Sequence, residues 1–183
     1  MAQTTGAWTL AELDRLPDDG NRYELVDGEL FVTPAPSPGH ETLASHLLFI
    51  LVPYVHSQKL GLLSTPRAVV RQHGSQVEPD MMVRPATPAL PQTWAEMPTP
   101  LLVVEILSQT TRRRDHVQKR AFYVRLGVAE YWIVDRFERT IRVIRPDADD
   151  VVCDAKLVWH PSGATESLQM DVAALFFAAL GAV

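Results

Sequence analysis

The sequence predicts an α/β (α+β) layer fold, a central mixed sheet flanked by helices. The runs at 101–107 and 131–134 are apolar throughout, which is typical of strands that are covered on both faces. Between them, residues 112–126 form a predicted helix, and Gly127 is suited to close it. A strand, a helix and a strand in this order indicate a crossover unit, so we expect layers of helix and sheet.

The other elements follow from local signals. Thr9 and Glu12 form a capping box for a first helix. Asp27-Gly28 is a strong hairpin turn signal, and Pro53 is expected to end or kink the second helix. In chain order we expect a helix at 9–16, a hairpin of strands at 23–26 and 29–33, a loop at 34–39, a helix at 40–56, strands around 62–63, 68–71 and 77–83, an irregular proline-rich excursion at 84–100, strands at 140–144 and 156–159 with an acidic turn at 147–150 between them, and a closing helix at 171–180.

Length and composition indicate one globular domain. The 183 residues suffice for a real core, and we expect a single domain over 1–183 with its core at about 23–145. No apolar run is long enough to span a bilayer, and no signal peptide is visible. The single cysteine, Cys153, fits a reducing compartment, so we expect a cytoplasmic protein. The net charge of −5 argues against broad, non-specific nucleic-acid binding but leaves room for a small site that uses metal ions.

Two acids stand inside predicted strands, Asp80 in the run 77–83 and Glu105 in the run 101–107. A lone carboxylate buried in an apolar strand is costly unless it is paired or binds a metal. If the strands pair with Asp80 beside Glu105, both can hold one Mg²⁺, which prefers oxygen ligands. The carbonyl of Ile106 is a candidate third protein ligand. The competing interpretation is structural, with Asp80 accepting hydrogen bonds at a strand end and Glu105 pairing with a buried arginine.

The helix after Glu105 supplies candidate cations. Lys119 borders the face that carries Phe122, so we expect it to orient water or to neutralise charge on a phosphate. Helical lysines also commonly extend to solvent, which is the structural alternative. Glu24 is a third acid in an apolar strand and a candidate for the same site, although it can equally pair with Arg22. The candidate phosphate contacts are Arg112, Arg113, Arg114 and Gln118, against the alternative of a solvated helix start.

Several segments in a fixed order resemble the Uma-two family of restriction-endonuclease-like proteins, within the PD-(D/E)XK nuclease superfamily. The segments are Tyr23-Glu24-Leu25-Val26-Asp27-Gly28-Glu29-Leu30, Glu78-Pro79-Asp80, Val103-Val104-Glu105-Ile106-Leu107-Ser108, then Asp115, Lys119, Tyr123 and Gly127-Val128-Ala129-Glu130-Tyr131-Trp132-Ile133-Val134-Asp135. The resemblance implies a restriction-endonuclease-like core, here with an N-terminal helix and β-hairpin extension. Asp80 matches the first acid of the superfamily and Glu105 the second. The lysine expected two positions after Glu105 is Leu107, so Lys119 would have to act from the helix.

Residues and resemblance together predict a Mg²⁺- or Mn²⁺-dependent DNA endonuclease that hydrolyses phosphodiester bonds. A homodimer is expected, because cutting both strands of a duplex favours two-fold symmetry. The alternative is a catalytically inactive nuclease-fold scaffold, or a module that binds nucleic acid or protein. The acidic net charge and Leu107 favour that alternative.

Overall fold

A central six-stranded sheet organises the computed structural model, which describes residues 6–33, 35–109 and 111–182. Its strand order is β10-β9-β8-β7-β6-β3. β7 and β8 run parallel and the other pairs run antiparallel, so the sheet is mixed, as expected. The strands are β3 (Gly61–Ser64), β6 (Met81–Pro85), β7 (Leu102–Ile106), β8 (Glu130–Asp135), β9 (Thr140–Ile144) and β10 (Val151–Cys153).

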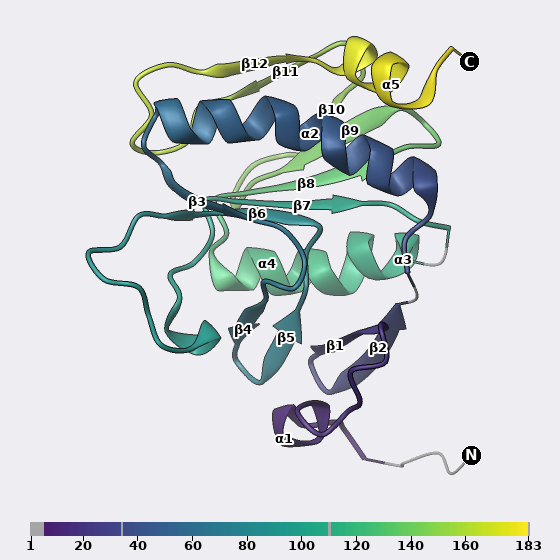
Figure 1. Ribbon diagram of the computed structural model, residues 1–183, viewed down its shortest axis with the longest axis vertical. Helices are drawn as coiled ribbons and strands as arrows, with labels where there is room; N and C mark the ends of the chain where they lie inside the picture. Colours follow the sequence, from purple (N-terminus) through teal and green to yellow (C-terminus); the bar gives the residue numbers. More distant parts are fainter. Residues whose placement is uncertain (1–5, 34, 110, 183) are drawn as a thin grey trace.

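Helices cover both faces of this sheet (Figure 1). α2 (Pro38–Ser57) lies on one face, with α5 (Val172–Leu180) and the hairpin of β11 (Lys156–Trp159) and β12 (Leu168–Asp171) beyond it. The other face carries α3 (Arg112–Arg114), the π-helical turn η2 (Asp115–Lys119) and α4 (Arg120–Leu126). The fold class is therefore confirmed, including the crossover from β7 through these helices to β8.

A second, smaller sheet lies beyond α4 and brings the N-terminal hairpin toward the centre (Figure 1). Its order is β2-β1-β5-β4. The strands are β1 (Arg22–Val26), β2 (Glu29–Thr33), β4 (Val70–Gln72) and β5 (Ser75–Val77). The short helix α1 (Leu10–Leu13) begins at its Thr9 cap, and a 3-10 turn, η1 (Trp94–Glu96), interrupts the proline-rich excursion.

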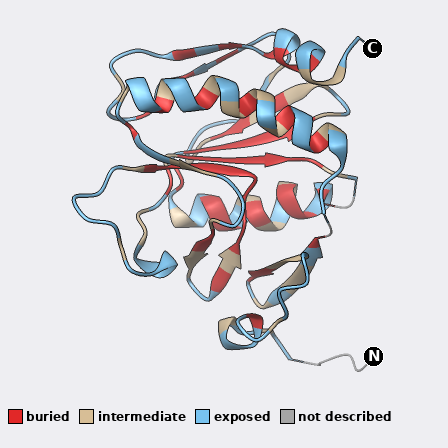
Figure 2. Cartoon of the chain, viewed as in Figure 1, coloured by how far each residue is buried: buried red, intermediate tan, exposed pale blue. Residues whose placement is uncertain are grey.

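The core divides at the central sheet, and strand alternation decides which side chain goes to which half. Leu102, Val104 and Ile106 pack on the α2 side, whereas Val103 and Leu107 pack on the α4 side. Figure 2 shows the inner strands β6, β7 and β8 buried along most of their length, while each covering helix turns an exposed face outward. No described helix has both the length and the apolar character needed to cross a membrane.

Four sequence predictions need correction. Pro53 does not end α2, because Leu51 and Val55 on either side of it are both buried and their packing outweighs the local cost of about 3 kcal/mol. The predicted loop 34–39 gives way to α2 at Pro38, because Ser37 caps the helix and Pro38 suits its first turn; residue 34 is outside the described residues. Asp80 precedes β6 and is not part of it. The predicted continuous helix at 112–126 contains the π-helical turn η2.

Candidate active site

The pairing of β6 with β7 brings the two acids together. Met81 lies opposite Val104 in this antiparallel register, and continuing it by one residue sets Asp80 opposite Glu105. Both side chains are buried, with 5% and 3% of their surface exposed, and both line a cavity of about 220 Å³. The expectation that the acids meet at mid-sheet therefore has a geometric basis, although Asp80 reaches the site from the residue before its strand.

Asp80 is held by three donors. Arg22 Nη1 lies 2.9 Å from Oδ1, while His40 Nε2 and the backbone nitrogen of Ile106 lie 3.0 and 2.8 Å from Oδ2. Burial alone would raise the pKa of Asp80. The hydrogen bond and charge of His40, together with Arg22 and the Ile106 N–H, outweigh burial and hold that pKa well below its usual range. Asp80 is therefore a fixed anion whose two oxygens already have partners.

Glu105 is in a different electrostatic state. Lys119 Nζ and the Tyr123 hydroxyl donate to its Oε1 at 2.7 and 2.9 Å, whereas no hydrogen bond to Oε2 is found among the described residues. Burial raises the pKa of Glu105, and the nearby charges of Asp115 and Asp80 add to the rise against the opposing effect of Lys119. Two neighbouring carboxyls thus have pKa values displaced in opposite directions, an arrangement that is common in acid–base sites.

Lys119 is the centre of a buried ion network. Its Nζ also lies 2.8 Å from Glu24 and 3.8 Å from Asp115, and only 1% of the side chain is exposed. Burial opposes its charge, but the carboxylates of Glu105, Glu24 and Asp115 raise its pKa, so the ammonium stays charged. Arg114 Nη1 adds a second cation 3.2 Å from Glu24. The alternative that Lys119 extends into solvent is wrong.

The π-helical turn explains how one helix supplies this network. η2 runs from Asp115 to Lys119, and such turns are frequent at functional sites. Both of its terminal residues are buried; Lys119 contacts Glu24 of the small sheet and Glu105 of the central sheet, and Asp115 lies 3.8 Å from Lys119. Tyr123, one turn further on, reaches the same Glu105 oxygen as Lys119. A helical spacing rule places Lys119 near the buried face, but it contains no signal for the inserted turn.

The structure separates the remaining predicted residues. Ile106 lines the acid cavity, and its backbone nitrogen contacts Asp80. The three arginines diverge, because Arg114 turns inward while Arg112 pairs with Asp135 at 2.5 Å. Arg113 and Gln118 line a separate hollow beside β2 and do not line the acid cavity.

Sequence reasoning did not select Arg22, His40, Asp115 and Tyr123 as site residues. Arg22 starts β1 and His40 lies in the first turn of α2, so neither has a distinctive local motif. Both residues contact Asp80 only because the chain folds back over 58 and 40 positions. Tyr123 lies four residues after Lys119, and this helical spacing, together with the place of Asp115 and Tyr123 in the family pattern, is the signal that could have found them.

The donor set fits a particular kind of metal binding. Among the described residues, no group of three or more His, Cys, Asp or Glu side chains is arranged to hold a metal ion. Mg²⁺ is often bound through one or two carboxylates, with water and substrate phosphate completing its shell. Asp80 and Glu105 meet that requirement, because they share a cavity and Glu105 Oε2 accepts no hydrogen bond from the described residues.

Comparisons with known proteins identify the fold and the family of the chain. The chain resembles a crystal structure described as a "putative nuclease belonging to DUF820 from Anabaena variabilis ATCC 29413", with a TM-score of 0.81 and 23% sequence identity over 94% of this chain and 99% of that one. At this identity the likeness shows the fold. A search of curated proteins finds no match. Residues 10–175 match the Uma2 family, described as "Putative restriction endonuclease". The chain belongs to the Uma2 family of restriction-endonuclease-like proteins.

Proposed function

We propose that the protein is a metal-dependent endonuclease that hydrolyses phosphodiester bonds in DNA. The observation that carries the proposal is the cavity in which Asp80, Glu105 and Lys119 meet, with Lys119 Nζ 2.7 Å from Glu105. Leu107 occupies the position where the superfamily pattern has lysine, and it is fully buried in the core. Lys119 brings an ammonium to the acids from the helix and so supplies the missing cation.

Each residue has a defined part in this proposal. Asp80 and Glu105 hold a Mg²⁺ or Mn²⁺ ion, with the Ile106 carbonyl as a further ligand. When bound, the ion supplies positive charge to the phosphate and lowers the pKa of a coordinated water. Lys119 orients the attacking water and stabilises negative charge on the phosphate. Glu24 fixes Lys119 through its 2.8 Å contact and leaves the ammonium directed toward Glu105.

The contacts of Arg22 and His40 with Asp80 lower the affinity of Asp80 for a metal ion. Both donate to its oxygens, so the ion must share or displace one of these contacts. Arg22 is 15% exposed and borders the cavity, where its guanidinium is suited to turn from Asp80 to a substrate phosphate.

DNA binding, the oligomeric state and the location are further parts of the proposal. Arg112 has 47% of its side chain exposed at the start of the helix, and with Arg113 and Gln118 it is proposed to contact flanking backbone phosphates. A homodimer would place two such sites on the two strands of a duplex. The cytoplasm, with its reduced thiols, is the proposed compartment.

Cleavage of supercoiled plasmid by the purified chain tests the proposal. We expect nicked or linear DNA with Mg²⁺ or Mn²⁺ and none with EDTA. Asp80→Asn and Glu105→Gln should each lower the rate by at least about a hundredfold, because an interaction of the reacting site is lost. Glu138→Gln removes an exposed carboxylate that does not line the cavity and is the matched control. Equal cleavage by all variants would show that the activity comes from elsewhere.

One observation favours a second candidate, a nuclease fold without turnover that serves as a scaffold or binding module. Both oxygens of Asp80 are already engaged by Arg22, His40 and the Ile106 N–H. A closed Asp80–Arg22 pair would hold the fold and leave no ligand for metal. Calorimetric titration separates the two, since the scaffold predicts no Mn²⁺ binding by the folded wild type.

A further inference from the structure

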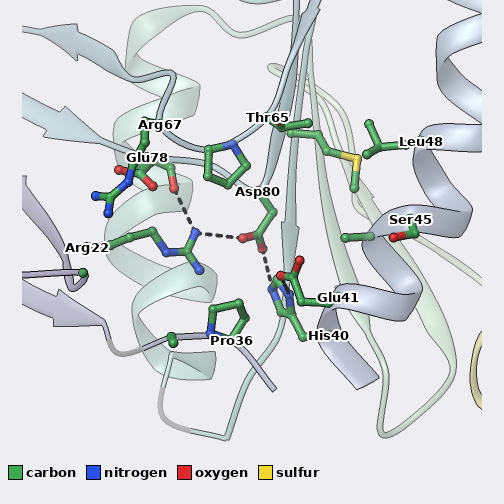
Figure 3. Close-up of a pocket in the computed structure, with 15 residues that line it drawn as sticks. Arg22, Pro36, His40, Glu41, Ser45, Leu48, Thr65, Arg67, Glu78 and Asp80 are labelled. Atoms are coloured by element: carbon green, nitrogen blue, oxygen red, sulfur yellow. Dashed lines mark hydrogen bonds and ion pairs between the residues drawn. The ribbon is translucent and has the colours of Figure 1, made fainter. Parts of the chain in front are cut away.

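A second cavity shares a wall with the acid site. It measures about 390 Å³, which falls in the size range of small-molecule pockets. Arg22, His40 and Asp80 line both cavities. Figure 3 shows the Arg22 guanidinium at this wall, between the backbone of Glu78 and the carboxylate of Asp80. A group that fills the second cavity would therefore lie next to a phosphate bound at the acids.

Glu78 lines this cavity and carries an unsatisfied hydrogen-bond acceptor. The residue is 7% exposed, and its Oε1 is buried without a hydrogen-bond partner. Leaving a buried carboxyl oxygen without a donor is costly, so natural structures rarely keep such an atom without a reason. The mechanism proposed above does not use Glu78. Its position and its vacant acceptor indicate a ligand that donates a hydrogen bond.

The other residues that line the cavity restrict the chemical class of the ligand. Pro36, Leu48 and Met81 give the cavity apolar surface. Arg67 also lines it, with 59% of its side chain exposed, and lies with Glu78 on one side of the view in Figure 3 while Leu48 lies on the other. The guanidinium groups of Arg22 and Arg67 are balanced by the carboxylates of Glu41, Glu78 and Asp80, so the lining favours a neutral ligand over an ion. A flat, neutral group with an N–H donor at one end suits the apolar walls, the charges and Glu78 together.

We propose that this cavity receives a nucleobase next to the scissile phosphate, and that Glu78 selects a base with an exocyclic amino group. This inference rests on the proposed function and adds a substrate preference to it. Glutamate accepts hydrogen bonds from the amino group of cytosine, whereas thymine presents a carbonyl at the same ring position. A base turned out of its stack into a pocket is read by such contacts. The chain should therefore favour adenine, cytosine or guanine over thymine at this position.

Binding of two oligonucleotides tests the preference without requiring turnover. One is a short, dye-labelled oligothymidylate, and the other carries a single central 5-methylcytosine. The two central bases have the same methyl group, and they differ in the amino or carbonyl group at position 4 and in the proton on the neighbouring ring nitrogen. Fluorescence anisotropy with Ca²⁺ in place of Mg²⁺ gives the two affinities. The wild type should bind the 5-methylcytosine strand roughly tenfold more tightly, the effect of one satisfied buried polar group.

Two variants assign the preference to the pocket. Glu78→Leu replaces the hydrogen-bond acceptor with an apolar side chain of similar size, and it should abolish the tenfold difference in affinity between the two oligonucleotides. Ser45→Trp places a bulky ring in the cavity from an exposed position of α2 and should also abolish it, which covers the case in which Glu78→Leu does not fold. Glu138→Leu, at an exposed site outside the cavity, is the charge-matched control and should keep the difference.

The outcomes separate this inference from the proposed function. A protein that cleaves DNA but binds both strands equally overturns the base pocket alone. A protein that shows the preference without cleaving any DNA supports the pocket and removes the nuclease. A preference that survives in both Glu78→Leu and Ser45→Trp shows that the base is read elsewhere, and absence of binding to either strand overturns the inference.

Discussion

Replacing Lys119 by methionine tests whether the buried ion network is needed for stability. The substitution keeps an unbranched side chain, one atom shorter, and removes an ammonium 2.7 Å from Glu105 and 2.8 Å from Glu24. Glu24 keeps a cation, because Arg114 lies 3.2 Å from it, so the loss falls mainly on Glu105. Stranding one buried charge costs about 3–5 kcal/mol, a large fraction of the roughly 5–15 kcal/mol that stabilises a domain.

Urea denaturation in EDTA, followed by tryptophan fluorescence, measures this loss. Lys156→Met, at an exposed position of β11, is the matched control and should change the free energy of unfolding by less than about 0.5 kcal/mol. The loss in Lys119→Met should be largest near pH 9, above the pKa of about 8 to which burial raises Glu105, and smaller at neutral and acidic pH, where Glu105 takes up a proton and no longer carries a stranded charge.

A double variant shows whether Glu105 is the partner that matters. Lys119→Met with Glu105→Gln removes both charges, so it should recover at least about 1 kcal/mol relative to Lys119→Met alone. The reasoning is wrong if Lys119→Met is as stable as Lys156→Met, or if the double variant is no more stable than the single one.

Three further predictions concern other parts of the fold. Gly61→Ala should lower the free energy of unfolding in urea by more than about 2 kcal/mol, because φ is +132° and a Cβ would lie 2.2 Å from the Arg84 carbonyl oxygen. Gly74→Ala, which has open space around it, should cost less. Equal losses in the two variants would contradict this prediction. Arg71→Ala should cost at most about 1 kcal/mol at neutral pH, and the loss should shrink as pH falls, because the Arg71 hydrogen bonds lower the pKa of Asp14. The hydrogen bond from Arg71 to Gln76 does not titrate, so its share of the loss should remain. A wholly pH-independent loss would exclude the Arg71–Asp14 pair as its cause. Burial raises the pKa of Glu130 despite its hydrogen bonds with Trp132 and Arg145. The free energy of unfolding should therefore fall as pH rises from 4.5 through the higher pKa of the folded state. Glu130→Gln should remove that decline, and a decline that persists in the variant would assign it to another group.

Local signals in the sequence were sufficient for most of the fold. The capping box at Thr9 and Glu12, the hairpin turn at Asp27-Gly28 and the αL residue Gly127 all lie where these motifs predict. Each of these motifs satisfies backbone groups within a few residues, so no distant information is needed. The strand at 140–144 and the helix that follows Asp171 are likewise close to their expected bounds.

The elements that were missed depend on distant contacts. β5 and β10 have three residues each; β5 pairs with β4 and β1, and β10 pairs with β9. β12 contains Gln169, and it pairs with β11 in a hairpin that the sequence pattern did not signal. β12 alternates buried and exposed residues over only four positions, and β5 and β10 have three residues each, which is too short a stretch for periodicity to predict a strand.

The part of the candidate site that lies on or beside strands could be predicted from the sequence. Alternation placed Glu105 on the α4 side with Val103 and Leu107, and pairing with β6 then sets it opposite Asp80. The partners of Asp80 were not predictable, because Arg22 and His40 approach from the hairpin and from α2. These contacts are decided by how the layers pack.

Calorimetric titration of Mn²⁺ tests the central claim most directly, namely that Asp80 and Glu105 bind one divalent ion together. The account predicts one ion per wild-type chain, and an affinity at least about tenfold weaker in folded Asp80→Asn and in folded Glu105→Gln. Wild-type protein that binds no Mn²⁺, or variants that bind it as tightly as the wild type, would contradict the claim.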